Sequence, residues 1–142
     1  MKKEMSYRCV RLLMDSERFI RGKKKLAEMS GDEVELMIDN LQETAPDLAR
    51  ITVEFPYGEI LVRPGLDIRS RQIATVAALT ALGNAPVQLN GHIHMALNVG
   101  VTRGEVTEII TQMAVYAGFP AALNGMAVAK EVFRVRNEKG LS

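Results

Sequence analysis

The chain has 142 residues, of which 47% are hydrophobic and 25% charged, and 18 basic residues against 17 acidic ones give a net charge of +1. This composition is typical of one soluble globular domain, and the balanced charge provides no general attraction to nucleic acid or to an anionic membrane. The longest apolar runs end well short of the roughly 20 residues that a membrane span needs, and no signal-peptide core follows the N-terminus, so we expect a cytoplasmic protein.

Three helices are predicted in the first half of the chain. Their patterns cover residues 6–28, 33–43 and 46–57. The first has a narrow apolar stripe among basic residues, and the third begins at Pro46, because proline suits the first turn of a helix. The segment 58–66 contains the turn signal Pro64-Gly65 and is predicted to be an ordered loop.

Four further helices are predicted in the second half. They cover residues 68–82, 86–100, 103–117 and 120–136. Asp67 can cap the first of them, Gly83 ends it, and Pro86 begins the next. Residues 102–105, with the sequence TRGE, form a capping box, in which a threonine hydroxyl and a glutamate carboxylate accept from free backbone amides. After residue 136 we expect the chain to fray.

The fold class follows from these helices and from what the composition lacks. Only 5% of the residues are aromatic, tryptophan is absent, and no strand-like alternation of β-branched residues occurs. We therefore predict an all-α fold, a single-domain helical bundle of six or seven helices.

Both histidines of the chain lie on the predicted helix over residues 86–100. His92 and His94 are two positions apart, which places their rings about 200° apart around a helix, so they cannot bind one metal ion together. No metal site is expected. His92 shares its side of the helix with Gln88, one turn earlier, and this edge is either the wall of a pocket or a hydrogen-bonded helix contact. For His94 we expect a surface or subunit-contact role.

Three segments carry a resemblance to a known family. They read YGEILVRPGLDIRSRQIATVAALTALG, QLNGHIHMALNVGVTRGEVTEII and YAGFPAALNGMAVAKEV. In this order and spacing they resemble the carboxymuconolactone decarboxylase family, which implies an alkylhydroperoxidase D-like fold. The family domain is then expected over residues 46–138, after an N-terminal helical extension over 1–45 that packs on the same domain, and before a tail over 139–142.

The resemblance also points to one branch of the superfamily. Alkylhydroperoxidase D proteins carry C-x-x-C followed after three residues by a histidine. Placing that histidine on His92 puts the two cysteine positions at Ala85 and Gln88, and Cys9 is the only cysteine of the chain. Peroxide reduction by a dithiol needs a nucleophilic thiolate and a resolving cysteine. The chain therefore resembles the non-redox decarboxylase branch.

The family's namesake substrate, 4-carboxymuconolactone, arises during protocatechuate breakdown and is an unsaturated lactone with two carboxylates. Loss of carbon dioxide leaves an electron pair that delocalises into the lactone carbonyl, and protonation of the resulting dienolate gives an enol lactone. The substrate supplies its own electron sink, so the resemblance implies no cofactor. The protein must hold the carboxylates with cations, donate hydrogen bonds to the enolate and deliver a proton.

The candidate catalytic residues are His92, Arg71 and Glu59. His92 is the expected acid or enolate donor, because imidazole titrates near neutral pH. Arg71 is the preferred cation for a substrate carboxylate, and Glu59 is a candidate to orient the imidazole. For each of Arg63, Arg69 and Arg71, a solvent-facing or intersubunit salt bridge is the alternative role.

The candidate substrate-binding residues are Arg63, Arg69, Gln88, Tyr57 and Tyr116. Arg69 and Arg71 point apart on a helix, so at most one of them is expected to face a pocket. A tyrosine hydroxyl could donate to the lactone oxygen, whereas packing is the alternative role of Tyr116.

Two functions compete on the sequence. The first is a cofactor-independent decarboxylase of a small carboxylated lactone. The second is a non-redox, oligomeric family member that binds a ligand or partner without turnover, with the lysine-rich first helix as a docking surface. A peroxidase would have to rely on Cys9 alone. Family members form rings, so the resemblance implies a homo-oligomer, a trimer or hexamer.

Overall fold

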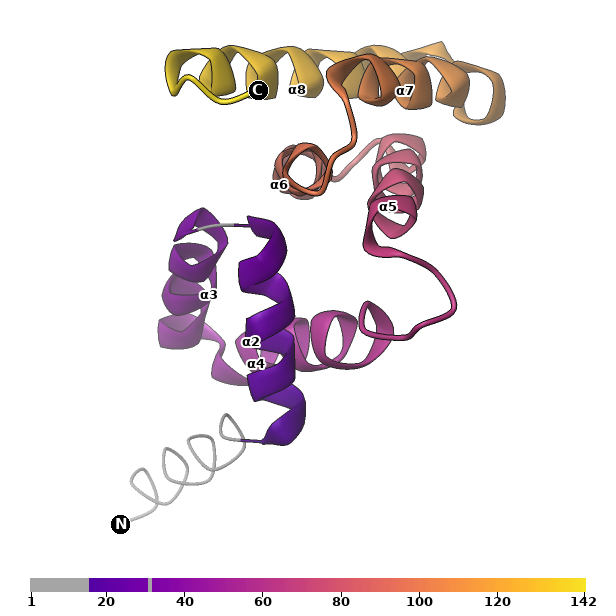
Figure 1. Ribbon diagram of the computed structural model, residues 1–142. Coiled ribbons are helices and arrows are strands. Elements are labelled where there is room, and N and C mark those ends of the chain that lie inside the picture. Colours follow the sequence, from indigo (N-terminus) through magenta and orange to yellow (C-terminus); the bar gives the residue numbers. More distant parts are fainter. Residues whose placement is uncertain (1–15, 31) are drawn as a thin grey trace. The chain divides into compact units, whose positions relative to one another are not determined.

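The computed structural model describes residues 16–30 and 32–142 (Figure 1). Cys9 and the first part of the helix predicted over residues 6–28 lie outside the described residues. The regular elements of the described chain are all helical, which confirms the predicted all-α fold. They are α2 (Glu17–Ser30), α3 (Asp32–Thr44), α4 (Pro46–Glu54), the π-helix η1 (Pro56–Ile60), α5 (Ile68–Leu82), α6 (Pro86–Asn98), α7 (Arg103–Ala117) and α8 (Phe119–Glu138).

Contacts between these helices divide the chain into two compact units, one ending at Gly65 and the other spanning Leu66–Ser142. The N-terminal unit holds α2, α3, α4 and η1, and the C-terminal unit holds α5 to α8. The predicted boundary at residue 45, between an extension and the family domain, stays a prediction. No helix in residues 16–30 and 32–142 combines the length and apolar character that crossing a membrane requires.

The N-terminal unit depends on close backbone contact between α2 and the segment that follows α3. A Cβ atom at Gly22 of α2 would lie 2.5 Å from the carbonyl oxygen of Val53, and one at Gly58 would collide with the carbonyl of Arg18. Arg21 adds a hydrogen bond of 2.7 Å from Nε to the Gly58 carbonyl. Only glycine leaves room for this approach, so these two positions fix how α2 packs on α4 and η1.

The chain after α4 differs from the prediction of a loop over residues 58–66. Pro56 lacks the N–H that would extend α4, and the backbone instead winds more widely. The amide of Ile60 bonds to the Phe55 carbonyl at 3.1 Å, and that of Leu61 bonds to the Pro56 carbonyl at 2.8 Å. The resulting π-helix continues to Ile60, so the non-helical connection to α5 is shorter than predicted.

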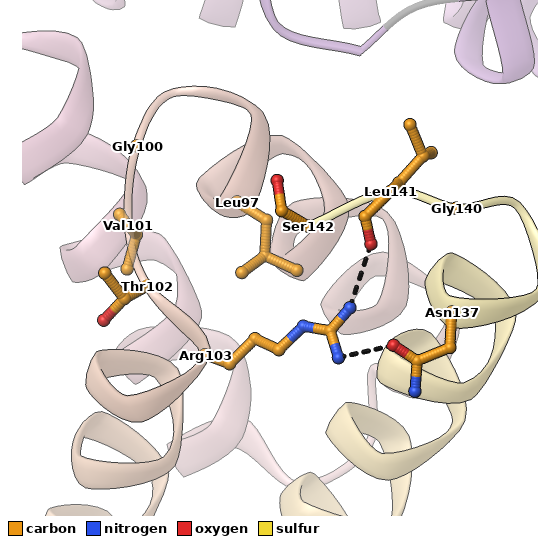
Figure 2. Close-up of a pocket in the computed structure, with 9 residues that line it drawn as sticks. All are labelled: Leu97, Gly100, Val101, Thr102, Arg103, Asn137, Gly140, Leu141 and Ser142. Carbon is orange, nitrogen blue, oxygen red and sulfur yellow. Dashed lines mark hydrogen bonds between the residues drawn. The ribbon is translucent and has the colours of Figure 1, made fainter.

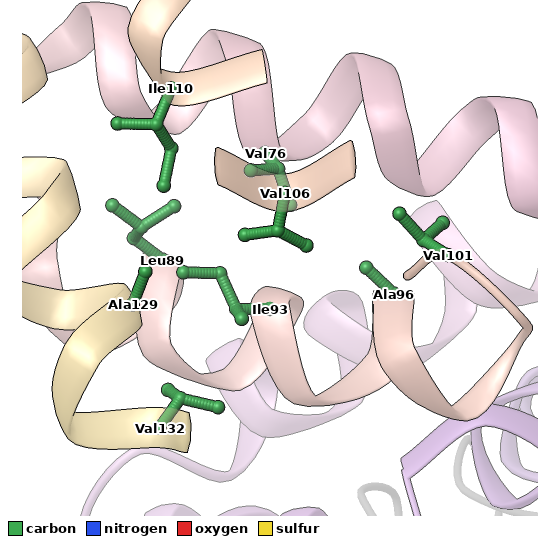
Figure 3. Close-up of a cluster of buried hydrophobic side chains, with 9 residues drawn as sticks. All are labelled: Val76, Leu89, Ile93, Ala96, Val101, Val106, Ile110, Ala129 and Val132. Atoms are coloured by element: carbon green, nitrogen blue, oxygen red, sulfur yellow. The ribbon is translucent and has the colours of Figure 1, made fainter. Parts of the chain in front are cut away.

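The C-terminal unit surrounds one apolar core, to which all four of its helices contribute (Figure 3). The buried side chains at its centre belong to Val76, Leu89, Ile93, Ala96, Val101, Val106, Ile110, Ala129 and Val132. Three of them, Leu89, Ile93 and Ala96, form the buried stripe of α6 at helical spacing. His92 lies immediately beside this stripe, and that position determines its surroundings.

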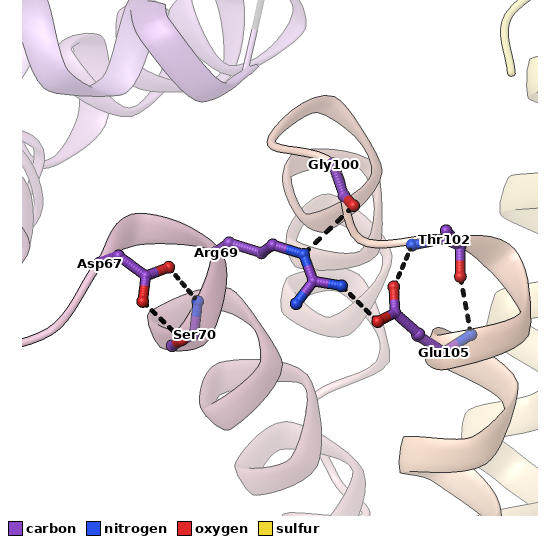
Figure 4. Close-up of polar contacts among 6 residues, drawn as sticks. All are labelled: Asp67, Arg69, Ser70, Gly100, Thr102 and Glu105. Atoms are coloured by element: carbon purple, nitrogen blue, oxygen red, sulfur yellow. Dashed lines mark hydrogen bonds and ion pairs between the residues drawn. The ribbon is translucent and has the colours of Figure 1, made fainter.

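Local signals in the sequence predicted the helix ends of this unit well. Asp67 accepts a hydrogen bond from the amide of Ser70, and Gly83 ends α5 with φ of 70°. The capping box of α7 is present, with the Thr102 hydroxyl accepting from the Glu105 amide and the Glu105 carboxylate accepting from the Thr102 amide (Figure 4). These contacts satisfy backbone amides that a helix leaves unpaired at its start.

The C-terminal tail is held in place, in contrast to the predicted fraying after residue 136. Helix α8 continues to Glu138, and the amide of Leu141 then bonds to the Arg136 carbonyl at 2.8 Å. The guanidinium of Arg136 donates to the main-chain oxygen of Ser142 at 2.6 Å, and that of Arg103 donates to the Leu141 carbonyl at 3.0 Å. Two arginines of the folded unit therefore supply the donors that hold the tail.

Candidate functional site

His92 is paired with a buried glutamine of the neighbouring helix. Its Nδ1 atom lies 3.0 Å from Oε1 of Gln72 on α5, and Gln72 is 0% exposed. An amide oxygen can only accept a hydrogen bond, so Nδ1 carries the proton in this pair and the Nε2 atom of a neutral ring presents a lone pair. The pair therefore fixes both the orientation of the imidazole and its tautomer.

Sequence reasoning had not selected Gln72. It shares the buried face of α5 with Val76 and Thr80, at intervals of four residues, which is one face of a helix. Two polar residues on an otherwise apolar face must find hydrogen-bond partners, because an unpaired buried amide is costly. Thr80 bonds to the Val76 carbonyl of its own helix at 2.8 Å, whereas Gln72 reaches across to His92. This four-residue spacing was the signal that could have revealed it.

Burial also shifts the protonation equilibrium of His92. The half-buried ring loses contact with water, and this desolvation lowers its pKa below the ordinary value of 6.5. In the free protein the imidazole is therefore neutral at pH 7, with Nε2 able to accept a proton. Such a group can act as a base, or as an acid once a negative ligand has favoured its protonated form.

The two arginines at the start of α5 make different contacts. Arg69 donates from Nε to the Gly100 carbonyl at 3.3 Å and pairs with the carboxylate of Glu105, so it ties α5 to the start of α7 (Figure 4). The Thr102 amide and then Arg69 lower the pKa of Glu105 to about 2. Arg71 donates from Nε to the Leu66 carbonyl at 3.0 Å and directly precedes Gln72.

Gln88 and Tyr116 occupy the surface of the same unit. Gln88 is exposed in the first turn of α6, one turn before His92. Tyr116 is 77% exposed near the end of α7. Neither is buried beside the imidazole, and their proposed contacts with substrate remain predictions.

The other three candidates belong to the N-terminal unit. Tyr57 is buried in η1, and burial raises the pKa of its hydroxyl to about 12, so the group stays a neutral donor. Glu59 pairs with Arg18, with 3.1 Å between the guanidinium and the carboxylate. Arg63 is exposed on the connection to α5. The predicted contact of Glu59 with His92 stays a prediction.

No group of three or more histidine, cysteine, aspartate or glutamate side chains in residues 16–30 and 32–142 is arranged to hold a metal ion. The best-defined part of the candidate site is the pair of His92 and Gln72.

Comparison with protein families gives a match that spans more than half of the chain. Residues 46–131 match the carboxymuconolactone decarboxylase family. The protein belongs to the carboxymuconolactone decarboxylase family. The matched range contains α4 to α7 and most of α8, and so includes both members of the pair of His92 and Gln72. The predicted resemblance is confirmed, and with it the expected class of enzyme, a decarboxylase-like lyase.

Individual relatives of this family member extend the similarity. It is 35% identical over 121 residues to a 4-carboxymuconolactone decarboxylase of Acinetobacter baylyi, covering 84% of this chain and 90% of that protein. It is 29% identical over 126 residues to a nitrosuccinic acid decarboxylase of Metarhizium robertsii, covering 86% and 85%. An uncharacterized 15.0 kDa protein of Paracoccus denitrificans is 30% identical over 100 residues, covering 70% of this chain and 75% of that protein.

Proposed function

We propose that the protein is a cofactor-independent decarboxylase of a small carboxylated lactone of the 4-carboxymuconolactone type, and that the product is an enol lactone. The observation that carries the proposal is the pair of His92 and Gln72, an oriented imidazole beside a buried amide. The relative of Acinetobacter baylyi, which covers most of the chain, supports the choice of substrate class.

The reaction needs little from the protein beyond binding and proton delivery. The bond between the ring carbon and its carboxylate breaks, carbon dioxide leaves, and the electron pair moves through the alkene into the lactone carbonyl. A proton is then added to the carbon beside that carbonyl. Both steps balance without an oxidant or reductant, because the substrate itself accepts the electron pair.

We assign the proton donor to Nε2 of His92. Burial keeps the imidazole neutral in the free protein, whereas a substrate with two carboxylates brings negative charge beside it and favours the imidazolium form. The proton gained resides on Nε2, because the Nδ1 proton stays bonded to Gln72. Substrate binding therefore charges the acid that the second step uses, and solvent restores it afterwards.

The remaining candidates supply binding contacts in this proposal. Arg71 is preferred over Arg69 as the carboxylate-binding cation, because its place in the segment LDIRSRQ resembles the more regular arginine of the family. Tyr57 is suited to donate to the lactone oxygen, since its raised pKa of about 12 keeps its proton in place. Arg63 remains a proposed contact to substrate and Glu59 a proposed orienting group for His92.

Gln88 and Tyr116 complete the proposed set of substrate contacts.

The relative named nitrosuccinic acid decarboxylase indicates how far the substrate class extends. Nitrosuccinic acid and 4-carboxymuconolactone both carry a carboxylate whose electron pair a neighbouring π system can accept. This shared chemistry supports a site that binds anions and delivers a proton, with the substrate as its own electron sink.

The test is release of carbon dioxide from 4-carboxymuconolactone and, in parallel, from nitrosuccinic acid. The wild-type protein is expected to act on the lactone, and His92→Ala is expected to lower kcat by about 10²- to 10⁴-fold, the usual contribution of a general acid. His94→Ala, on another side of the same helix, is the matched control and should retain activity. Turnover of nitrosuccinic acid alone would contradict the lactone assignment, and no turnover of either would favour a binding protein without catalysis.

We also propose that the protein is a cytoplasmic homo-oligomer, a trimer or hexamer. The support comes from one end of the C-terminal unit, where the turn between α5 and α6 packs on the start of α8. A Cβ atom added at Gly83 in this turn would lie 3.9 Å from the Cβ atom of Ala121. The exposed apolar side chains around it are Leu82, Val87, Val115, Tyr116, Phe119 and Leu123. Such a surface favours contact with another subunit. Light scattering that gives a monomeric mass would contradict the proposal.

A further inference from the structure

A pocket lies in the C-terminal unit, between the connection from α6 to α7 and the C-terminal tail (Figure 2). Its volume is about 700 Å³, within the range of small-molecule sites. His92 is not among its lining residues. The wall consists of Leu97, Gly100, Val101, Thr102, Arg103, Asn137, Gly140, Leu141 and Ser142.

Arg103 is the charged side chain of this pocket. Its guanidinium donates to Oδ1 of Asn137 at 2.7 Å and to the Leu141 carbonyl at 3.0 Å, which uses two of its five N–H donors (Figure 2). It also lies over the ring of Phe133, 5.3 Å from the centroid. The aromatic contact and the two hydrogen bonds hold the guanidinium in one orientation, so little side-chain entropy remains to be lost when a ligand binds.

A second guanidinium adds positive charge close by. Arg136 is 5% exposed and bonds to Oδ1 of Asn98 at 2.9 Å and to the main-chain oxygen of Ser142. Burial, and then the charge of Arg103, lower the pKa of Arg136. Neither arginine pairs with an acidic side chain of the described residues, in contrast to Arg69 and Arg134. A negative charge placed here would relieve the repulsion between the two cations.

We propose that this pocket is a second binding site, distinct from the site at His92, for a small organic carboxylate with an apolar body. The carboxylate accepts from the remaining N–H groups of Arg103, and the apolar body lies against Leu97, Val101 and Leu141. No aspartate or glutamate side chain is among the lining residues of the pocket in the described chain, and Arg103 is the charged side chain that an anion would meet there. The arginines that hold the tail thus also shape one wall of the site.

The test uses benzoate as the probe and benzamide, its neutral counterpart of the same shape, as the control ligand, both measured by isothermal titration calorimetry on the full chain. Benzoate is expected to bind and benzamide to bind at least about tenfold more weakly, since a charge-assisted bond to arginine is lost. Arg103→Gln is expected to weaken benzoate binding by about tenfold or more. Arg134→Gln, an exposed arginine of α8 that does not line the pocket, is the matched control and should bind as the wild type does.

Two further variants protect the test against misfolding and against binding elsewhere. Leu97→Trp is expected to fill the pocket and weaken benzoate binding while Arg103 stays intact. His92→Ala should retain benzoate binding, which separates this site from the proposed catalytic one. Benzoate binding that survives both Arg103→Gln and Leu97→Trp, equal binding of benzamide, or no binding by the wild type would each overturn the proposal.

Discussion

Oε1 of Gln72 on α5 accepts a hydrogen bond from Nδ1 of His92 on α6 at 3.0 Å, and this contact connects the two helices through a buried amide and a half-buried ring. Replacing Gln72 by glutamate places a negative charge against the imidazole, which favours its protonated form. The proposed reaction needs a protonated His92, so kcat/KM should fall as the pH rises. The midpoint of this fall should lie below pH 6.5 in the wild type and move to higher pH in Gln72→Glu.

The matched control for that experiment is Gln88→Glu, which adds the same charge on an exposed position one turn from His92. Solvent screens such a charge, so the shift should be much smaller. Equal shifts in the two variants would mean that the contact with Gln72 has no special role. The midpoint of the fall with rising pH should lie at higher pH in the kcat profile than in the kcat/KM profile, because the charge of the bound substrate raises the pKa of the imidazole.

Arg69 and Arg71 should respond differently to the same substitution. Arg71→Gln is expected to lower kcat/KM by about 10- to 100-fold, the usual effect of losing a charge-assisted hydrogen bond to a carboxylate. Arg69→Gln should instead lower the melting temperature, because it removes the ion pair with Glu105. Steady-state kinetics and thermal denaturation of both variants check this, and the reverse pattern would exchange their roles.

His92 should make stability depend on pH. Its pKa is lowered in the folded protein and is 6.5 when unperturbed, so the unfolded chain binds more protons between those values. The stabilising contribution is complete above pH 6.5 and is lost as the pH falls toward the lowered pKa. Urea denaturation between pH 5 and 8 should therefore show this dependence in the wild type and a flatter one in His92→Gln. Parallel curves for the two proteins would exclude a buried, neutral imidazole.

Glu105 should also make the protein less stable as the pH falls, but in a more acidic range than His92 does. Its pKa of about 2 lies below the ordinary value of 4.5, so its stabilising effect is present above pH 4.5 and is lost as the pH falls toward 2. The melting temperature of Glu105→Gln should be lower than that of the wild type at pH 6, and the two should converge below pH 3. Glu108→Gln, an exposed position on the same helix, is the control and should match the wild type throughout.

Gly125 should resist any larger side chain. A Cβ at this position would lie 2.9 Å from Cγ2 of Thr80 and 3.3 Å from Cγ2 of Ile110, so Gly125→Ala should destabilise the protein by about 1–3 kcal/mol through overpacking. Chemical denaturation measures the loss. The double variant Gly125→Ala/Thr80→Ser removes the nearest methyl group and should recover part of it.

The control for Gly125 is Gly104→Ala in the first turn of α7. Apart from its chain neighbours and the backbone of its own helix, the new methyl group would have the Thr102 hydroxyl oxygen as its nearest neighbour, at 3.9 Å. This change should be neutral or stabilise the protein by up to about 1 kcal/mol, because alanine restricts the unfolded chain. Equal changes in the free energy of unfolding for Gly125→Ala and Gly104→Ala would mean that the close approach of α8 to α5 does not explain the glycine at position 125.

Much of the fold could be predicted from the sequence because it is set by local chemistry. The roles of Asp67, Gly83 and the capping box at residues 102–105 each depend on atoms within a few residues, and the structure confirms all three. The membership of the family followed from short motifs in the same way. The π-helix after Pro56 was missed, because a wide turn is stabilised by burying Tyr57 and Gly58, and burial is a tertiary property.

At the candidate site, the sequence determines some features and the tertiary structure determines others. The sequence by itself determined that His92 lies beside a buried helical stripe, because helical periodicity alone places it there. Only the packing of α5 on α6 decided that Gln72 is its partner, and only the meeting of α5 with α7 decided that Arg69 pairs with Glu105. Hydrogen bonds and ion pairs between distant residues depend on how helices rotate and exclude water against each other, and no local pattern of residues encodes that rotation.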